Sequence, residues 1–200
     1  MVNYNFEPRR SREDFGWHSR GYLPHLDDPE RTQFLTFRLF DSMPQDLVAK
    51  WRAESRDDVQ FRKRVEKYLD AGYGHCWLQL PEIGSMICNS LQFHHTKKYD
   101  LDSWVVMPNH AHVLLTPLDG FHLDEIEHSI KSYTASEANK TLNRRGQFWA
   151  IECFDRYIRD YRHFNAVIRY IENNPVKAGL CRSPNDWPFS SAAEGWKKSG

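Results

Sequence analysis

The run from Tyr99 to Thr116 constrains the fold more than any other part of the chain. Apolar and β-branched residues dominate 99–106 and again 110–116, and Met107-Pro108-Asn109 separates the two stretches. Such runs, bounded by turn residues, are typical of buried strands, and Pro and Asn favour a tight turn between them. The sequence therefore predicts two consecutive strands that pair antiparallel around this turn.

His110 and His112 open the second of these strands. Side chains alternate across a strand, so residues two apart share one face. Two imidazoles that point the same way from one rigid element are half of a metal site. Histidines packed against apolar neighbours are nevertheless commoner than ligands, so the pair needs a third ligand before a metal site is indicated.

The rest of the pattern predicts one domain that mixes strands and helices without regular βαβ alternation, which indicates a small α+β sandwich with an antiparallel sheet. We expect an irregular N-terminal arm over 1–30, the domain over 31–182 and a C-terminal tail over 183–200. The predicted elements are a strand over Thr32–Phe40 and helices from Asp41-Ser42-Met43-Pro44 to about Leu69, from Pro81 through Leu91, over about Leu123–Leu142 and over Asp160–Asn173.

Composition narrows the function classes. The formal net charge is zero, which is not the overall signature of a nucleic-acid-binding protein. Residues 131–182, however, hold ten Lys and Arg against five Asp and Glu, which permits a local phosphate-binding face, although solvated helix faces would explain it equally well.

The four cysteines form no CxxC pair, which argues against a zinc ribbon. We find no secretory signal or apolar run of membrane-spanning length, and expect a cytoplasmic protein with reduced thiols and no membrane partner.

A second constellation lies in Ile168–Leu180. If this stretch begins as a helix, Tyr170 and Asn174 lie on one face, one turn apart. Asn174 should sit at the helix end, because Pro175 disfavours helical backbone at the residue before it. An amide oxygen there could ligate a metal, with a tyrosine hydroxyl beside it. The alternative is a core tyrosine and a helix-capping asparagine.

The chain resembles the REP-associated tyrosine transposases, which belong to the single-tyrosine HUH (His-hydrophobic-His) transposases. Met107–Leu115 looks like the HUH motif, and further runs resemble this group in the same order along most of the chain. They are Arg20–His25, Phe34–Leu39, Lys131-Ser132-Tyr133-Thr134, Phe148-Trp149, Asp155–Asp160, Tyr170–Leu180 and Asp186–Ser191.

The resemblance implies a ferredoxin-like sandwich whose antiparallel sheet carries the HxH strand, with the catalytic tyrosine on a helix. By position, His110 and His112 match the metal-binding histidines, Tyr170 matches the nucleophile, and Asn174 matches the third metal ligand. The implied activity is metal-dependent cleavage and rejoining of single-stranded, hairpin (REP-like) DNA through a covalent 5′-phosphotyrosine.

The implied cofactor is Mg²⁺ or Mn²⁺. Imidazole ligands by themselves suit zinc, nickel or copper better, whereas an amide ligand and open water positions favour the harder ions. Single-stranded DNA is held by aromatic stacking and by Lys and Arg contacts. The candidates are Arg144, Arg145, Phe148, Trp149, Arg156, Arg159 and Lys177.

Several alternatives stay open on the sequence alone. Tyr133 could be the nucleophile instead, with Glu137 one turn later as a ligand. The histidine pair could belong to a zinc-dependent hydrolase with a distant carboxylate. The chain could also be a non-catalytic or domesticated hairpin-binding module. A monomer is expected rather than a homodimer.

Overall fold

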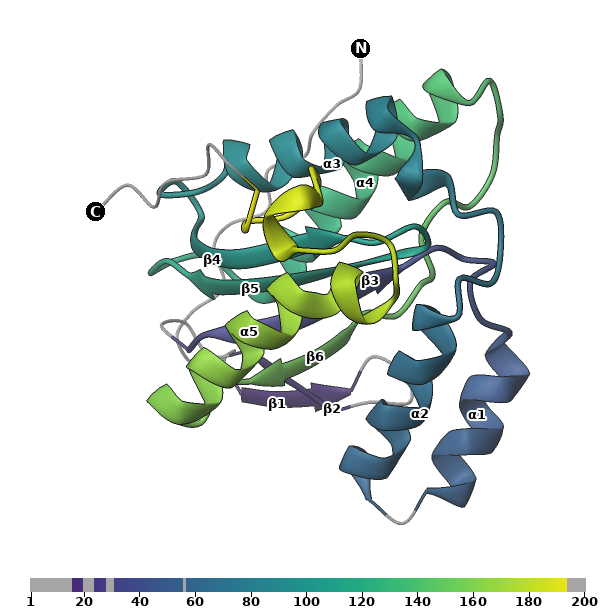
Figure 1. Ribbon diagram of the computed structural model, residues 1–200. Coiled ribbons are helices and arrows are strands. Elements are labelled where there is room, and N and C mark those ends of the chain that lie inside the picture. Colours follow the sequence, from purple (N-terminus) through teal and green to yellow (C-terminus); the bar gives the residue numbers. More distant parts are fainter. Residues whose placement is uncertain (1–15, 20–23, 28–30, 56, 194–200) are drawn as a thin grey trace.

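A four-stranded antiparallel sheet in the order β4-β5-β3-β6 lies at the centre of the protein (Figure 1). The computed structural model describes residues 16–19, 24–27, 31–55 and 57–193. Its strands are β1 (Gly16–Ser19), β2 (Pro24–Asp27), β3 (Gln33–Arg38), β4 (Tyr99–Val106), β5 (His110–Pro117) and β6 (Phe154–Tyr157). Its helices are α1 (Gln45–Glu54), α2 (Asp58–Asp70), α3 (Pro81–Phe93), α4 (Leu123–Thr141) and α5 (Tyr161–Lys177), with 3₁₀ turns η2 (Trp77–Gln79) and η3 (Pro184–Asp186).

The predicted strand pair around the Met-Pro-Asn turn is confirmed as β4 and β5. Val106 pairs with Ala111, and the turn closes where the Met107 N–H donates to the His110 carbonyl at 2.8 Å. β5 also pairs with β3, so it lies inside the sheet and is covered on both faces. That position explains why the strand is buried almost throughout.

Helices cover both faces of the sheet (Figure 1). On one face, Leu35, Phe37 and Val113 pack with side chains of α3 and α4 in the larger apolar core. On the other face, Phe34 and Leu114 pack with Val167 and Ile171 of α5. The alternation along β3 and β5 therefore sends odd-numbered residues toward α3 and α4, and sends even-numbered residues, including His110 and His112, toward α5.

The helix predicted from Asp41 to about Leu69 is two helices, α1 and α2. Pro44 is the N-cap of α1. Asp57 breaks the run because its carboxylate caps α2 by accepting from the Gln60 N–H. The two helices pack on one another and on β6 through a separate apolar cluster that includes Phe61 and Phe154.

Both predicted terminal segments contain residues that form ordered hydrogen bonds. Within the arm predicted to be irregular, β1 and β2 pair antiparallel. Within the predicted tail, the Trp187 indole donates to the Val106 carbonyl and the Phe189 carbonyl accepts from the Val106 N–H. β4 is an edge strand, so this segment satisfies backbone groups that would otherwise face solvent. Residues 1–15, 20–23, 28–30 and 194–200, including part of the Arg20–His25 run, lie outside the described residues.

The predicted α+β class with an antiparallel sheet is confirmed. No helix in the described ranges is both long enough and apolar enough to cross a membrane.

Candidate active site

His110 and His112 lie side by side at the start of β5. Their ring centroids are 4.7 Å apart, and both side chains are buried. On the neighbouring strand, Arg38 pairs with His110 and Thr36 pairs with His112. Two central strands therefore fix the backbone beneath both imidazoles.

Hydrogen bonds at the Nδ1 atoms orient the two rings. Asn109 donates its side-chain amide to the Tyr73 carbonyl at 2.9 Å, which turns its Oδ1 toward His110 Nδ1 at 2.7 Å. Because that oxygen only accepts, His110 carries its proton on Nδ1 and keeps a lone pair on Nε2. On the second ring, the Thr36 hydroxyl lies 2.9 Å from His112 Nδ1 and holds that imidazole by the corresponding nitrogen. A hydrogen bond to one ring nitrogen of a histidine commonly fixes the orientation of the ring and so the direction of its other nitrogen.

Tyr170 and Asn174 face the histidines from α5. Tyr170 Oη lies 3.4 Å from His112 Nε2, and the two ring centroids are 5.4 Å apart. Asn174, one helical turn later, is buried. The structure therefore brings together the four residues that the sequence singled out.

The prediction that α5 ends before Pro175 is wrong, because the helix continues to Lys177. Pro175 stands in the last turn, where it removes only the bond that its missing N–H would make to the carbonyl of Ile171. The following turn is closed by the Ala178 N–H donating to the Asn174 carbonyl at 2.9 Å. Asn174 is consequently held inside a helix and not at a frayed end.

Buried polar atoms in this cluster lack hydrogen-bond partners among the described residues. They are His110 Nε2, Asn174 Oδ1 and Asn174 Nδ2. An unpaired buried polar group costs about 1–3 kcal/mol, so such groups are few in a folded protein and each calls for an explanation. Neutral imidazole nitrogens and an amide oxygen are electron-pair donors, so this cluster fits a divalent cation.

The cluster does not fit a site made of histidine, cysteine and carboxylate ligands. Within the part of the chain that the structure describes, no group of three or more His, Cys, Asp or Glu side chains is placed to hold a metal ion. The zinc hydrolase alternative needs such a carboxylate beside the histidine pair. The buried side chain near the histidine pair is instead the amide of Asn174, which favours a site made of His110, His112 and Asn174 beside Tyr170.

Burial sets the charge states of the site. It lowers the pKa of His110 to about 4 and lowers the pKa of His112 well below its ordinary value, with His110 and Lys177 adding to the effect. Burial also raises the pKa of the Tyr170 phenol strongly, and the carboxylates of Glu66 and Asp70 add to it. Both imidazoles are therefore neutral, and the phenol is protonated, near pH 7.

Charged side chains from two other elements surround Tyr170. Lys177 pairs with Asp70 of α2 at 2.8 Å, and its ammonium lies 5.8 Å from the Tyr170 ring centre. Arg156 of β6 lies over the Phe34 ring at 5.1 Å. Phe34 itself stacks on His112 with centroids 5.2 Å apart.

Sequence reasoning missed the supporting residues of this site. Thr36 and Phe34 could have been found, because their alternation with Leu35 and Phe37 places them on the histidine face once β3 is paired with β5. Glu66 and Asp70 had no such signal, since the register between α2 and the sheet is set only by tertiary packing.

Tyr133, the competing nucleophile, lies elsewhere. It is an exposed residue of α4, and α4 packs on the face of the sheet opposite the histidines. Glu137, its proposed ligand partner, pairs with Lys140. The geometry therefore separates both residues from the histidine pair.

A family model described as "Transposase IS200 like" matches residues 73–174. The matched segment is just over half of the chain, and it includes His110, His112, Tyr170 and Asn174. The chain belongs to the IS200-like transposase family.

Two relatives are similar to this chain. A REP-associated tyrosine transposase of Escherichia coli (strain K12) is 33% identical over 100 residues, which are 48% of this chain and 55% of that protein. The match thus spans about half of the relative's length. A solved structure of a REP-associated tyrosine transposase bound to a REP hairpin has a TM-score of 0.53 and 18% identity, covering 84% of this chain and 79% of that one. It shows that the two chains share a fold.

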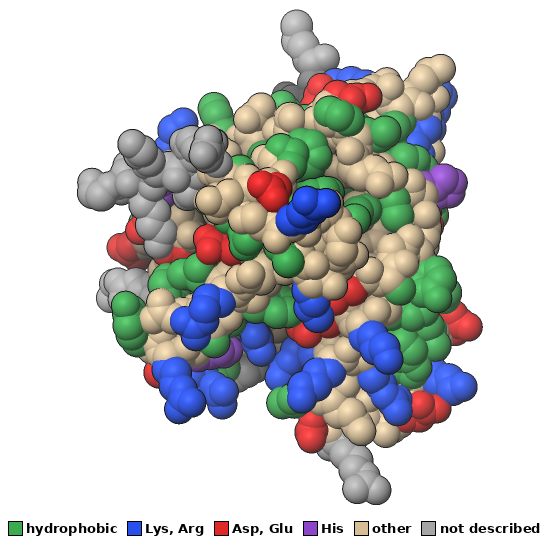
Figure 2. All heavy atoms as spheres, in the orientation of Figure 1, with side chains coloured by type: hydrophobic (Ala, Val, Ile, Leu, Met, Phe, Trp, Pro, Cys, Tyr) green, Lys and Arg blue, Asp and Glu red, His purple; other side chains and the backbone are tan. Residues whose placement is uncertain are grey.

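The basic residues predicted for this IS200-like transposase fall into two groups. Arg156 lies on β6 and Lys177 lies on α5, both close to Tyr170, and Arg159 lies in the connection between these two elements. Figure 2 shows Lys and Arg side chains gathered over the lower part of this face, around α5 and α2. Arg144 and Arg145 follow α4, at a separate place.

The structure leaves Trp149 no exposed ring face for the base stacking that the sequence suggested. It is 5% exposed in the core, and its indole N–H donates to the Thr134 hydroxyl at 2.8 Å. Phe148, beside it, is also buried. Aromatic residues of this loop were plausible surface residues only because the sequence does not reveal which of them point inward.

We expect Thr36→Val to weaken metal binding in this family member. The change leaves the His112 Nδ1 without its hydroxyl partner, which should lower the free energy of unfolding by about 1–3 kcal/mol. Loss of such a supporting bond typically lowers metal affinity by about 10–100-fold. Titration with Mn²⁺ and thermal unfolding measure the two effects. Thr116→Val is the control, because Thr116 lies on β5, the strand that carries His112, but its hydroxyl pairs with that of Thr32. It should leave the metal affinity unchanged. Equal Mn²⁺ affinity in both variants would contradict this role of Thr36.

Proposed function

We propose that this chain cleaves and rejoins single-stranded DNA through a covalent bond to Tyr170, assisted by a divalent metal ion. The observation that carries the proposal is a tyrosine hydroxyl beside a buried histidine pair, on the same helix as a buried amide whose polar atoms have no partner. Tyr170 Oη lies 3.4 Å from His112 Nε2, and His110 Nε2 and Asn174 Oδ1 lack other partners. The sheet that carries the two histidines is proposed to be the ferredoxin-like scaffold that the family resemblance implies.

The proposed ligands are His110 Nε2, His112 Nε2 and Asn174 Oδ1, and the proposed ion is Mg²⁺ or Mn²⁺. When bound, the ion would polarise the scissile phosphate and stabilise the departing 3′-oxygen. The chain prepares for it by holding both imidazoles neutral, because burial keeps their pKa values low. Metal binding requires deprotonated ligands, so no proton must be displaced from these nitrogens near neutral pH.

Tyr170 is proposed as the nucleophile. Its oxygen would form a bond to phosphorus while the bond from phosphorus to the 3′-oxygen breaks, which leaves a 5′-phosphotyrosine and a free 3′-hydroxyl. The covalent bond conserves the phosphodiester energy, so a later attack by a 3′-hydroxyl can rejoin DNA. Arg156, which lowers the pKa of the phenol, and the ammonium of Lys177 place positive charge where negative charge would develop.

The proposed substrate is hairpin DNA of the REP type with a single-stranded flank. Support comes from the solved relative, which is bound to a REP hairpin, and from the curated relative that carries the same name. Arg156, Arg159 and Lys177 surround the site with positive charge that suits a phosphate backbone.

The test is incubation of the full chain with a 5′- or 3′-labelled hairpin oligonucleotide and Mn²⁺, followed by a denaturing gel. A slow-migrating band that protease removes is expected, and it should be absent when a chelator is present. Binding of the hairpin without any such band, over a set of flanking sequences, would overturn the proposal in favour of a non-catalytic hairpin-binding protein.

A further inference from the structure

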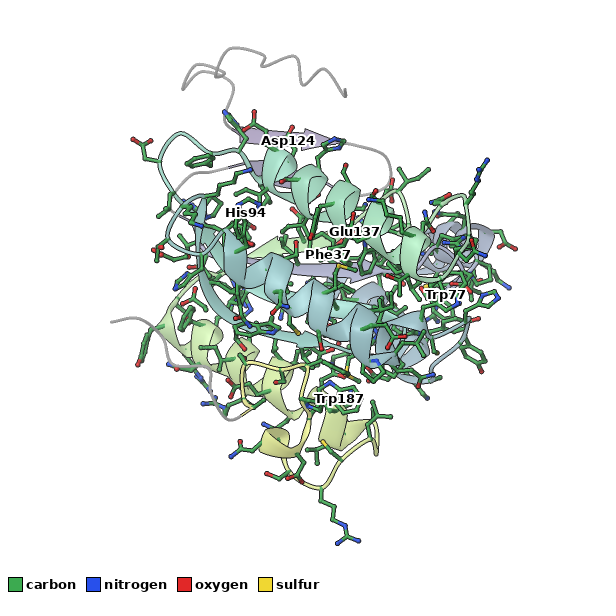
Figure 3. The ribbon with its side chains drawn as sticks, turned by 90° about the horizontal axis from the view of Figure 1, so that it is seen from above. Phe37, Trp77, His94, Asp124, Glu137 and Trp187 are labelled. Carbon is green, nitrogen blue, oxygen red and sulfur yellow. The ribbon has the colours of Figure 1, made fainter. Side chains whose placement is uncertain are left out.

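An aromatic surface that the proposed chemistry does not use lies at the end of the sheet where β5 begins. It consists of Phe40, Tyr73, His75, Trp77 and Arg144, and it is called the Trp77 platform below. Phe40 is 37% exposed and Tyr73 is 53% exposed, although large aromatic side chains are usually buried. Trp77 lies at one end of α3 and His94 at the other (Figure 3).

The centre of the Trp77 platform is a column of nearly parallel rings that runs from the core to solvent. Buried Phe148 stacks with Trp77 at a centroid distance of 5.9 Å and an angle of 13°. Trp77 stacks in turn with His75 at 4.5 Å and 20°. The His75 side chain is 62% exposed, so the column ends on a flat ring with open space around it.

This exposed ring is held in place. The Asp41 carboxylate bonds both the His75 ring, through Nδ1, and the His75 backbone N–H. Gly74 adopts a φ of +92°, and a Cβ at that position would meet the Asp41 carbonyl at 3.0 Å. The loop is therefore built to fit closely around Asp41, which keeps the ring from rotating freely. A fixed flat surface loses little conformational entropy when another flat group stacks on it.

Positive charge borders the column. The Arg144 guanidinium lies 4.3 Å from the Trp77 ring centre and 5.7 Å from that of Phe40. Hydrogen bonds to Asn139 and to the Gln147 carbonyl hold it there, and Arg145 beside it is exposed. Aromatic rings combined with arginine are the usual elements of surfaces that bind single-stranded nucleic acid.

The Trp77 platform is tied to the metal-ligand candidates. The carbonyl of Tyr73 accepts from the Asn109 amide, and the other end of that amide bonds His110. In addition, the Leu78 N–H donates to the carbonyl of Pro108 at 3.1 Å. The loop that carries His75 and Trp77 thus shares hydrogen bonds with the turn that positions His110.

We propose that the Trp77 platform binds an unpaired nucleobase of the same DNA strand whose phosphate is cleaved beside Tyr170. This inference rests on the proposed function for its substrate class. The base would continue the Phe148–Trp77–His75 column by stacking on His75, while Arg144 and Arg145 contact the adjoining phosphates. A base stacked there would place the strand relative to His110 and so fix which phosphate enters the site. Stacking reads the flat face of a base and not its edge, so the subsite tolerates several bases.

The test is equilibrium binding of hairpin oligonucleotides that carry 2-aminopurine at one flanking position at a time, because its fluorescence falls when it stacks. The Tyr170→Phe protein is used so that binding is measured without covalent trapping. One flanking position is expected to be quenched, and His75→Ala should restore its fluorescence and weaken binding by about fivefold or more. His75→Phe keeps a flat ring and should retain most of the quenching, which separates stacking from the loss of the imidazole nitrogens.

The matched control is Phe93→Ala. Phe93 is 64% exposed, next to His94 at the opposite end of α3 from Trp77 (Figure 3), and its removal should change neither quenching nor affinity. If no flanking position depends on His75, or if His75→Ala and Phe93→Ala bind alike, the Trp77 platform does not hold a base. The covalent assay decides the proposed function separately, since a protein that forms adducts without any effect of His75 would overturn this inference alone. A protein that stacks the base without forming adducts would overturn only the chemistry.

Discussion

Replacing Tyr170 with phenylalanine is expected to abolish the covalent DNA adduct completely. The affinity for the hairpin should stay within about twofold of the wild type, which corresponds to a change in binding free energy well below 1.4 kcal/mol, the equivalent of roughly tenfold. The change removes one oxygen, so no nucleophile is left 3.4 Å from His112 Nε2. It keeps the ring that packs edge-on against Phe34, so the shape of the site should persist. Denaturing gels measure the adduct, and fluorescence anisotropy of a labelled hairpin measures the affinity.

Tyr133→Phe is the matched control, because Tyr133 is the other tyrosine that the sequence offered as a nucleophile. It is exposed on α4, across the sheet from the histidines. Its replacement should leave adduct formation unchanged. Adducts that survive the loss of Tyr170 and disappear with the loss of Tyr133 would show that the site was assigned to the wrong tyrosine.

Asn174→Leu is expected to stabilise the metal-free protein and at the same time to remove its response to metal. Both polar atoms of this buried amide lack partners, and each unpaired group costs about 1–3 kcal/mol. A leucine of similar volume would relieve that cost. In a domain of this size each kcal/mol raises the melting temperature by about 2–4 °C.

Metal is expected to raise the melting temperature of the wild-type protein but not that of the Asn174→Leu protein. An ion present at about 100 times its dissociation constant adds roughly 2.7 kcal/mol to the stability of a folded protein that binds it. Scanning calorimetry with and without Mn²⁺ measures both effects. Asn173→Leu is the control, because Asn173 is exposed on the same helix, and it should respond to Mn²⁺ like the wild type. An Asn174→Leu protein that melts below the wild type, or that still responds to Mn²⁺, would argue that the amide has a structural role instead.

Local patterns predicted the sheet well where the strands are long and covered on both sides. β4 begins and ends as expected, and β5 starts at His110 as expected. Buried strands must be apolar along their whole length, so their sequence signal is strong. β6, four residues long at the sheet edge, and the short β1–β2 pair gave no comparable signal. Short edge strands depend on their neighbours for their hydrogen bonds, and no run of their own residues records that.

The candidate site was predicted in part, because some of its residues repeat with the period of the strand or helix that carries them. A period of two along a strand brings His110 and His112 together, and a period near four along a helix brings Tyr170 and Asn174 together. That these two pairs belong to one site came from resemblance, and their packing across β5 and α5 now places them in contact. Trp149 shows the opposite case, since loop residues have no period that separates a buried ring from an exposed one.

The sequence by itself determined the strand pair, the two short-range pairs of candidate site residues and the family resemblance, because each depends on residues that lie close together along the chain. Only the tertiary structure decided that α5 runs on through Pro175, that Asn109 and Thr36 orient the imidazoles, and that the segment after Ser183 covers β4. It also decided that His75, Trp77 and Phe148 form one column. These features join residues from separate elements, and their contacts depend on how helices and loops pack against the sheet, which no local pattern encodes.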